Sequence, residues 1–322
     1  MSTKQKQEKI QMNYNPRLDT EDYIEQNRWI QLVAEHLHHG SLALVLGAGA
    51  SAGMGLPTWP ELVRRCLDGA GVPYDPKQLE GNPTAERLGL LIDEVEDKYG
   101  AQHKYSPEYH ALVSDALYRD VKLGTDICQA PLLIALGALL MGSRRGSIRE
   151  VITFNFDIVL EYYLSLHGYT IQTFDRLPQL QSAADVRIAH INGVLHHAAY
   201  PVVTSRQLVF SARSMHKRTA TPVEVWKQYF HDLLTTHLVL FVGLSGADPV
   251  VFPTLTLVDD TIREKRVTGI WMFGKDIDAD PDSPYRKKDF LSRNIVPICK
   301  ANYNEIPNDL LEVCRQAATT YS

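Results

Sequence analysis

The sequence predicts an α/β protein with a doubly wound, mainly parallel sheet and an inserted helical subdomain. Short apolar runs typical of buried parallel strands recur along the chain, and helical segments lie between several of them. One long stretch after the first strand is helical without a clear strand signal. The chain of 322 residues is 44% hydrophobic and 22% charged, which is typical of an ordinary globular protein.

The N-terminal part of the chain leads into the first strand. Residues 1–18 are rich in Lys, Gln and Asn, so we expect a flexible tail before a folded domain at 19–322. Apolar residues at helical spacing predict an amphipathic helix over 21–39. The run SLALVL at 41–46 predicts a buried strand, and we expect a helix from about Trp59 to Leu67.

The rest of the chain supplies the insertion and the other strands. Residues 72–146 are mostly helical after a loop-rich start, and we interpret them as the helical insertion. Apolar runs predict further strands at 150–154, 169–174, 186–191, 237–242, 268–273 and 294–298. Helices are expected around 157–167, 222–236, 248–265 and 306–318. This alternation predicts the mainly parallel sheet.

Composition and charge narrow the function classes. The net charge of −5 argues against broad electrostatic capture of nucleic acid, although it leaves room for a local basic patch. The N-terminus is polar, and no segment approaches the run of about 20 apolar residues that a bilayer needs, so we expect a cytoplasmic protein. The four cysteines form no C-x-x-C pair, which argues against a zinc ribbon, and we expect no metal.

The first motif is a glycine-rich turn after the first predicted strand. Gly47, Gly49 and Ala52 satisfy G-x-G-x-x-G/A in LVLGAGASAGMGLPTW. Such glycines let the backbone approach a pyrophosphate, so the motif predicts binding of NAD. The alternative is a tight turn that binds nothing. A dehydrogenase would also carry an acidic residue at a second strand end, whereas Asp68, at that spacing, lies at a predicted helix end.

Two further motifs place polar residues at strand ends. In ITFNFD, Asn155 and Asp157 close an apolar strand, where side chains face the ligand crevice of parallel sheets, although Asp157 could simply cap the next helix. In RIAHINGVLHH, an extended strand would point His190 and Asn192 to the same face before Gly193 ends it. His190 could equally be a structural histidine.

The fourth motif, LFVGLSGADP, again brings small and polar groups to a strand end. Gly243 ends the apolar run, and Ser245 could bond a ribose or a phosphate. Asp248 before Pro249 is typical of a helix N-cap with proline at the first helical position, and we favour that role for it.

Together the four motifs, in this order, resemble the bacterial sirtuin-like family over about residues 41–275. The resemblance implies a Rossmann-like NAD-binding domain with an inserted helical subdomain, and it implies an NAD-consuming effector of anti-phage defence. It assigns Asn155 and Asp157 to the nicotinamide ribose and Ser245 to the adenosine ribose. The residues that it assigns to the NAD phosphates are Gly47, Ala48, Gly49 and Ser51.

Two departures from the family pattern refine this expectation. Sirtuin deacylases follow the first motif with a proline–acidic–phenylalanine–arginine stretch and carry a cysteine-paired zinc module; this chain has Thr58 and Trp59 after Pro57 and no such module. Protein deacylation is therefore not expected. The family's catalytic histidine stands directly before the glycine of the third motif, and Asn192 occupies that position.

The expected function is hydrolysis of NAD at the nicotinamide–ribose bond. This bond breaks through a cation-like transition state, so positioning and electrostatics can carry much of the catalysis. Asn155 would orient the water or ribose, Asp157 would support the positive ribose, and His190 would substitute as base. Asn192→His should then raise hydrolysis. The alternative is a catalytically weak or inactive NAD or ADP-ribose sensor, and either protein would work as a homo-oligomer or with an accessory defence protein.

Overall fold

The computed structural model places most of the chain. It describes residues 28–51, 53–81, 83–101, 105–121, 123–141, 147–177, 179, 183–200, 204–220, 225–245, 251, 255, 266–281, 283 and 285–320. The expected tail at 1–18, the start of the helix expected over 21–39 and most of the helix expected around 248–265 lie outside the described residues.

A seven-stranded sheet forms the centre of the molecule, in the order β3-β4-β2-β1-β5-β6-β7. Every pairing between neighbouring strands is parallel, which confirms the predicted doubly wound α/β fold. The strands are β1 (Leu42–Leu46), β2 (Glu150–Thr153), β3 (Ile171–Phe174), β4 (Val186–His190), β5 (Leu238–Val242), β6 (Gly269–Phe273) and β7 (Ile295–Cys299). Each lies within one residue or two of a predicted run.

The central strand β1 shows why apolar runs mark this sheet. All its side chains are buried, because helices cover both faces. Leu44 pairs with Val151 on one side and with Leu240 on the other, so no edge of β1 is exposed. A strand in this position tolerates no polar side chain without a buried partner.

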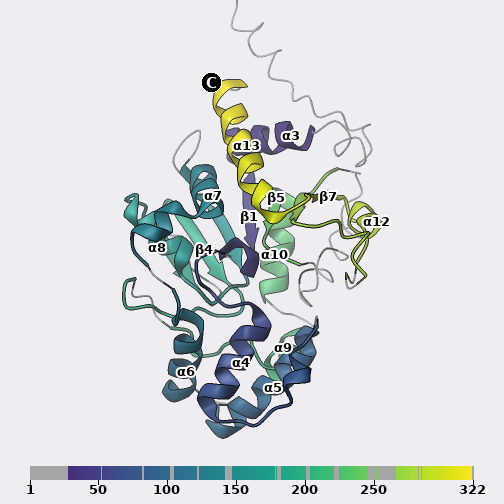
Figure 1. Ribbon diagram of the computed structural model, residues 1–322. Helices are drawn as coiled ribbons and strands as arrows, with labels where there is room; N and C mark the ends of the chain where they lie inside the picture. The colour runs from purple at the N-terminus through teal and green to yellow at the C-terminus, as the bar shows by residue number, and fades with distance from the viewer. Residues whose placement is uncertain are drawn as a thin grey trace, which may run out of the picture.

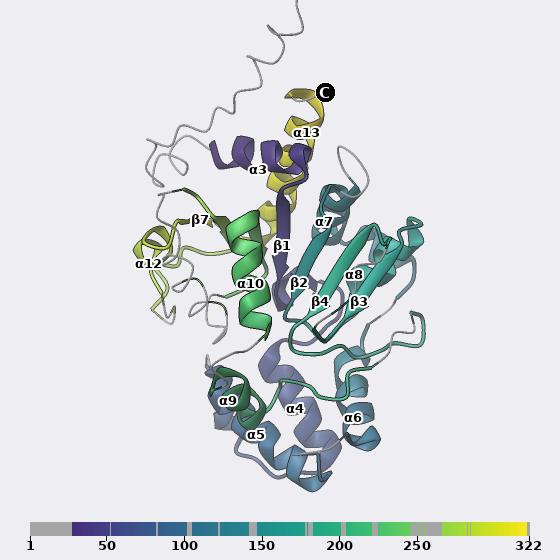
Figure 2. The same cartoon turned by 180° about the vertical axis from the view of Figure 1, so that it is seen from behind.

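Helices cover the two faces of the sheet in separate layers (Figures 1 and 2). One face carries α3 (Arg28–His39), α7 (Pro131–Met141), α8 (Val159–Leu166) and α13 (Ile306–Thr320). The other carries α10 (Val225–Thr236) and the short α12 (Lys287–Leu291). The C-terminal helix α13 contacts both α3 and α7, so it joins distant parts of the chain. Within the described residues, no helix is both long and apolar enough to cross a membrane.

A third group of helices lies beyond the carboxyl ends of the strands, at the bottom of both views (Figures 1 and 2). It consists of α4 (Trp59–Ala70), α5 (Ala85–Lys98), α6 (Pro107–Tyr118) and α9 (Ala212–Ala220). Its core also takes Phe156 and Leu195, which follow β2 and β4. No helix was expected at α9, and α7 packs against the sheet rather than with these helices.

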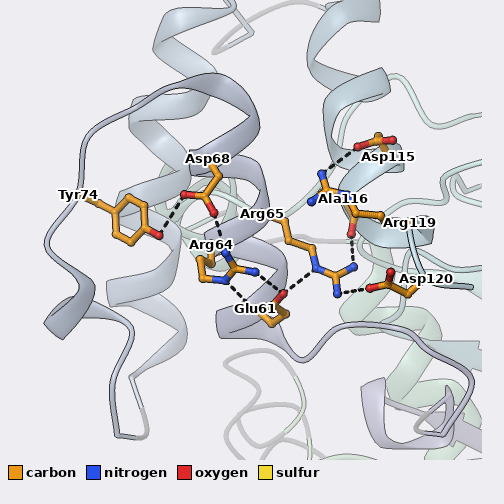
Figure 3. A network of polar contacts seen from close by, with 9 residues as sticks. All are labelled: Glu61, Arg64, Arg65, Asp68, Tyr74, Asp115, Ala116, Arg119 and Asp120. Atoms are coloured by element: carbon orange, nitrogen blue, oxygen red, sulfur yellow. Dashed lines mark hydrogen bonds and ion pairs between the residues drawn. The ribbon is translucent and has the colours of Figure 1, made fainter.

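Arg65 joins α4 to the end of α6 (Figure 3). Its guanidinium group donates to Glu61 on its own helix, to the carbonyl oxygen of Ala116 and, at 2.6 Å, to Asp120. The side chain is mostly buried, so these acceptors replace the water that the cation has lost. Asp68, on the same helix, is an exposed partner of Arg64 and takes no part in the sheet.

Candidate active site

The glycine-containing turns that follow β1 and β5 lie next to each other at the carboxyl edge of the sheet. From β1 the chain leads to β2 on one side, whereas β5 lies on the other side of β1. The turns that follow β1 and β5 are joined by backbone hydrogen bonds, from the Gly47 amide to the Val242 carbonyl at 3.0 Å and from the Gly49 amide to the Gly243 carbonyl at 2.9 Å. A switch point of this kind is where doubly wound sheets bind ligands.

The two turns are too close for any side chain between them. A Cβ atom on Gly47 would lie 2.6 Å from the Gly243 carbonyl oxygen, and one on Gly49 would lie 2.8 Å from the Gly243 Cα atom. Gly243 has a φ of 79°, and its Cβ would lie 2.2 Å from the Ala50 amide nitrogen. The glycines are therefore required by the packing of the turns themselves, whether or not a ligand binds there.

The residues of the first motif differ in how far they are exposed to solvent. Ala48 is exposed and Gly49 is partly exposed, whereas Ser51 is buried at the end of the short 3-10 helix η2 (Ala48–Ser51). Ala52, the third position of the glycine pattern, lies outside the described residues. The exposed backbone at Ala48 and Gly49 is the part of the turn that a ligand could reach.

Polar side chains from the segments that follow β1 and β2 converge beneath this turn. The Ser51 hydroxyl lies 3.1 Å from each carboxylate oxygen of Asp157 and donates to this carboxylate. The Asn155 amide donates to the Gly47 carbonyl at 3.1 Å and to the Ser51 hydroxyl at 3.3 Å. Ser51 from the first motif and Asn155 and Asp157 from the second therefore form one hydrogen-bonded cluster.

Asp157 is a buried carboxyl group with few charges to stabilise it. Burial, helped by the nearby Glu161 carboxylate, raises its pKa to about 6, against the opposing effect of hydrogen bonds from the Val159 amide and Ser51. The Val159 amide donates to Asp157 at 3.1 Å, so Asp157 also supports the start of α8. The capping role considered for Asp157 and its place in the cluster thus coexist in one side chain.

His190 is fully buried, and both of its ring nitrogens have partners. Nδ1 lies 2.9 Å from the Asn155 carbonyl oxygen, and Nε2 lies 2.6 Å from the Glu161 carboxylate on α8. Burial alone would lower the pKa of His190, but the charge and hydrogen bond of Glu161 outweigh it and raise the pKa. With both nitrogens engaged, His190 is suited to hold Asn155 and α8 in place and not to take a proton from a substrate.

Asn192 and His190 have different partners, and strand β4 ends before it reaches Asn192. β4 ends at His190, and the Gly193 amide donates to the His190 carbonyl across a turn. The Asn192 amide donates to the Phe154 carbonyl at 3.0 Å, while its side-chain oxygen accepts from Arg218 on α9 at 3.1 Å. The extended strand on which a shared face of His190 and Asn192 depended therefore ends before Asn192.

A small cavity of about 20 Å³ lies at the cluster. Ser51, Asn155, Asp157 and Glu161 give it polar walls, and leucines of α7 are among its apolar walls. A space of this size holds about one water molecule and not a nicotinamide ring. Ser245 is exposed on the turn after β5 and does not line this cavity, and Asp248 lies outside the described residues.

Glu161 is the site residue that the motifs did not reveal. It is buried and also accepts from the Thr173 hydroxyl at 3.4 Å. Its signal in the sequence is a carboxylate among the apolar positions Leu160, Tyr163 and Leu164 of a predicted helix, because a charge on a buried helix face needs a partner. Among the described residues, no group of three or more His, Cys, Asp or Glu side chains is arranged to hold a metal ion.

Comparison with known proteins finds one family match. Residues 149–298 match the family model of the SIR2-like domain. The matched segment covers slightly less than half of the chain and includes Asn155, Asp157, His190 and Gly243. A comparison with curated proteins found no match. The match and the seven-stranded parallel sheet together support a sirtuin-like family and an NAD-related function for this protein.

Proposed function

We propose that the protein binds NAD across the glycine turns and hydrolyses its nicotinamide–ribose bond. The observation that carries this proposal is the cluster of Ser51, Asn155 and Asp157 directly beneath the turn after β1. Glycines that exclude side chains from a switch point suit a pyrophosphate, and a carboxylate beneath them suits a positively charged ribose.

The reaction consumes one water molecule and yields nicotinamide, ADP-ribose and a proton. As the bond to nicotinamide breaks, positive charge develops on the ribose, and the ionised form of Asp157 stabilises it. Because the pKa of Asp157 is about 6, most of the group is ionised at neutral pH. This basicity also makes Asp157 better suited than an ordinary carboxylate to take the proton of the attacking water.

Asn155 positions the reacting groups in this scheme. Its amide nitrogen is held by Gly47 and Ser51, while none of the described residues donates to its side-chain oxygen. That oxygen can accept a hydrogen bond from a ribose hydroxyl or from water. His190 supports Asn155 through the backbone carbonyl, which replaces the role of substitute base that the sequence suggested.

A second function, NAD or ADP-ribose sensing without turnover, is favoured by the state of Asn192. This residue stands at the family's histidine position, cannot act as a base, and is tied to Phe154 and Arg218. The small cavity also excludes the nicotinamide ring in this conformation. A sensor would share the binding surface with an enzyme and differ only in turnover.

We further propose that the protein acts in anti-phage defence as a homo-oligomer or with an accessory defence protein. The support is the resemblance to sirtuin-like defence effectors and the harm that an unrestrained NADase would do to its own cell. Assembly or a partner would hold the enzyme inactive until a trigger arrives.

Incubating the purified full-length protein with NAD, alone and with the products of neighbouring genes, tests these functions. Chromatography should detect nicotinamide and ADP-ribose, and Asn155→Ala should abolish them. Asn308→Ala, an exposed asparagine on α13, is the matched control and should leave turnover unchanged. NAD binding by calorimetry without products would establish the sensor. Absence of both binding and products under all conditions would refute both functions.

A further inference from the structure

The Tyr303 side chain crosses the carboxyl edge of the sheet and ends at the glycine turn. Tyr303 begins the 3-10 helix η5 (Tyr303–Glu305), which follows β7. A Cβ atom on Gly274, just after β6, would lie 2.6 Å from the ring of Tyr303. At the other end, a Cβ atom on Gly49 would lie 2.8 Å from the Tyr303 hydroxyl oxygen. Tyr303 therefore spans from the end of β6 to the end of β1.

The hydroxyl group of Tyr303 is buried without a hydrogen-bond partner among the described residues. A buried polar group in this state is unfavourable, and such groups in folded proteins usually point to a missing water or ligand. Burial also raises the pKa of Tyr303, so the phenol stays protonated and remains a hydrogen-bond donor throughout the physiological pH range.

The direction in which the hydroxyl points identifies the missing partner. In glycine-rich dinucleotide sites, the second glycine of the motif lacks a Cβ so that the backbone can approach the pyrophosphate. Here the second glycine is Gly49, and the space that its Cβ would take is bounded by Gly243 and the Tyr303 hydroxyl. A phosphate that approaches Gly49 from this side meets a neutral donor with an unused proton.

We propose that Tyr303 is a binding residue of the NAD site and donates its hydroxyl proton to a phosphate oxygen of the dinucleotide. The proposal rests on the binding of NAD proposed above and extends the site beyond the segment that matches the SIR2-like domain, which ends at residue 298. Tyr303 also adds a contact from the half of the sheet that contains β6 and β7. The ligand is thereby held from both sides of the switch point.

Tyr303→Phe tests the proposal, because it removes only the hydroxyl. Calorimetry on the full-length protein should show the affinities for NAD and for ADP-ribose falling together, by about tenfold, since a hydrogen bond to a charged phosphate is lost. The thermal midpoint of the ligand-free variant should stay equal or rise, because an unpartnered buried hydroxyl has been removed. Tyr105→Phe, at an exposed tyrosine before α6, is the matched control and should change neither.

Three outcomes would overturn the proposal. Undiminished affinity in Tyr303→Phe, with wild-type protein that binds NAD, would overturn the role of Tyr303 alone. Tighter binding by Tyr303→Ala would show that the side chain obstructs the ligand and does not hold it. Wild-type protein that binds neither NAD nor ADP-ribose would overturn the proposed function together with this inference.

Discussion

Replacing Asp157 with asparagine should make the protein more stable at neutral pH while it abolishes NAD hydrolysis. Asparagine keeps a side-chain oxygen for the Val159 amide and the Ser51 hydroxyl, both 3.1 Å from the same carboxylate oxygen. It removes the negative charge that burial disfavours. Stability and activity should therefore move in opposite directions.

The size of the stability change follows from the pKa of Asp157. Folding raises this pKa from 3.8 to about 6, and each unit corresponds to about 1.4 kcal/mol, so ionisation costs the folded state roughly 3 kcal/mol. Protonated Asp157 stabilises the folded state below pH 3.8, and this contribution is lost as the pH rises through about 6. The variant should thus exceed wild type by roughly 2–3 kcal/mol at pH 7.5 and match it near pH 4.

Chemical denaturation of both proteins across pH 4–8 measures this difference. Asp115→Asn on α6 is the matched control, because this side chain is exposed; its free energy of unfolding should stay within about 0.5 kcal/mol of wild type. Chromatography of the NAD reaction should show no product from Asp157→Asn, and wild-type turnover should fall as the pH drops below about 6. Lower stability of the variant at pH 7.5, or a difference independent of pH, would refute the reasoning.

Three other substitutions probe the turns and the buried pairs. Gly243→Ala should lower the free energy of unfolding by roughly 2–5 kcal/mol and abolish NAD binding, because a Cβ atom there clashes with the turn after β1. Gly53 has a similar positive φ but open space around it, so Gly53→Ala should lose only about 1–2 kcal/mol and still bind NAD. Equal effects of the two substitutions would contradict the close approach of the turns. Asn192→His should lower the free energy of unfolding by roughly 2–4 kcal/mol without raising hydrolysis, because the contacts of the amide with Phe154 and Arg218 are lost. Faster hydrolysis at unchanged stability would argue against a structural role for Asn192. Glu161→Gln should lower the free energy of unfolding by roughly 3–5 kcal/mol, because His190 loses its charged partner. Chemical denaturation should show this loss of stability becoming smaller as the pH rises through the raised pKa of His190. A loss that does not change with pH would exclude a charged pair.

The sequence predicted the sheet well because its strands, apart from the partly exposed edge strand β3, are largely buried. A run such as LALVL has to be apolar throughout when helices cover both sides, and that requirement is visible without knowledge of the neighbours. Asn155 and Asp157 were found for the same reason, since they interrupt such a run at its end. The parallel pairing followed from the helices between strands.

The partners of the polar residues were not predictable in this way. His190 and Glu161 are 29 positions apart, and their pairing depends on how α8 settles against β4. The contact of Asn192 with Arg218 requires α9, a short helix with little apolar character that only tertiary packing makes recognisable. Periodicity in the sequence shows which face of a helix or strand is buried, but it does not show which residue of another element contacts that face.

The central place of β1 in the sheet has a consequence for how the protein is made. One partner strand of β1 begins at residue 150 and the other at residue 238, so a wholly apolar segment leaves the ribosome long before either. At about 5–20 residues per second, the wait for the first partner alone is roughly 5–20 s. During that time the apolar segment LALVL has no partner strand, and an exposed apolar segment of this kind is what chaperones bind. We expect the yield of native protein to depend on translation speed between these strands and on chaperones that shield the segment during synthesis.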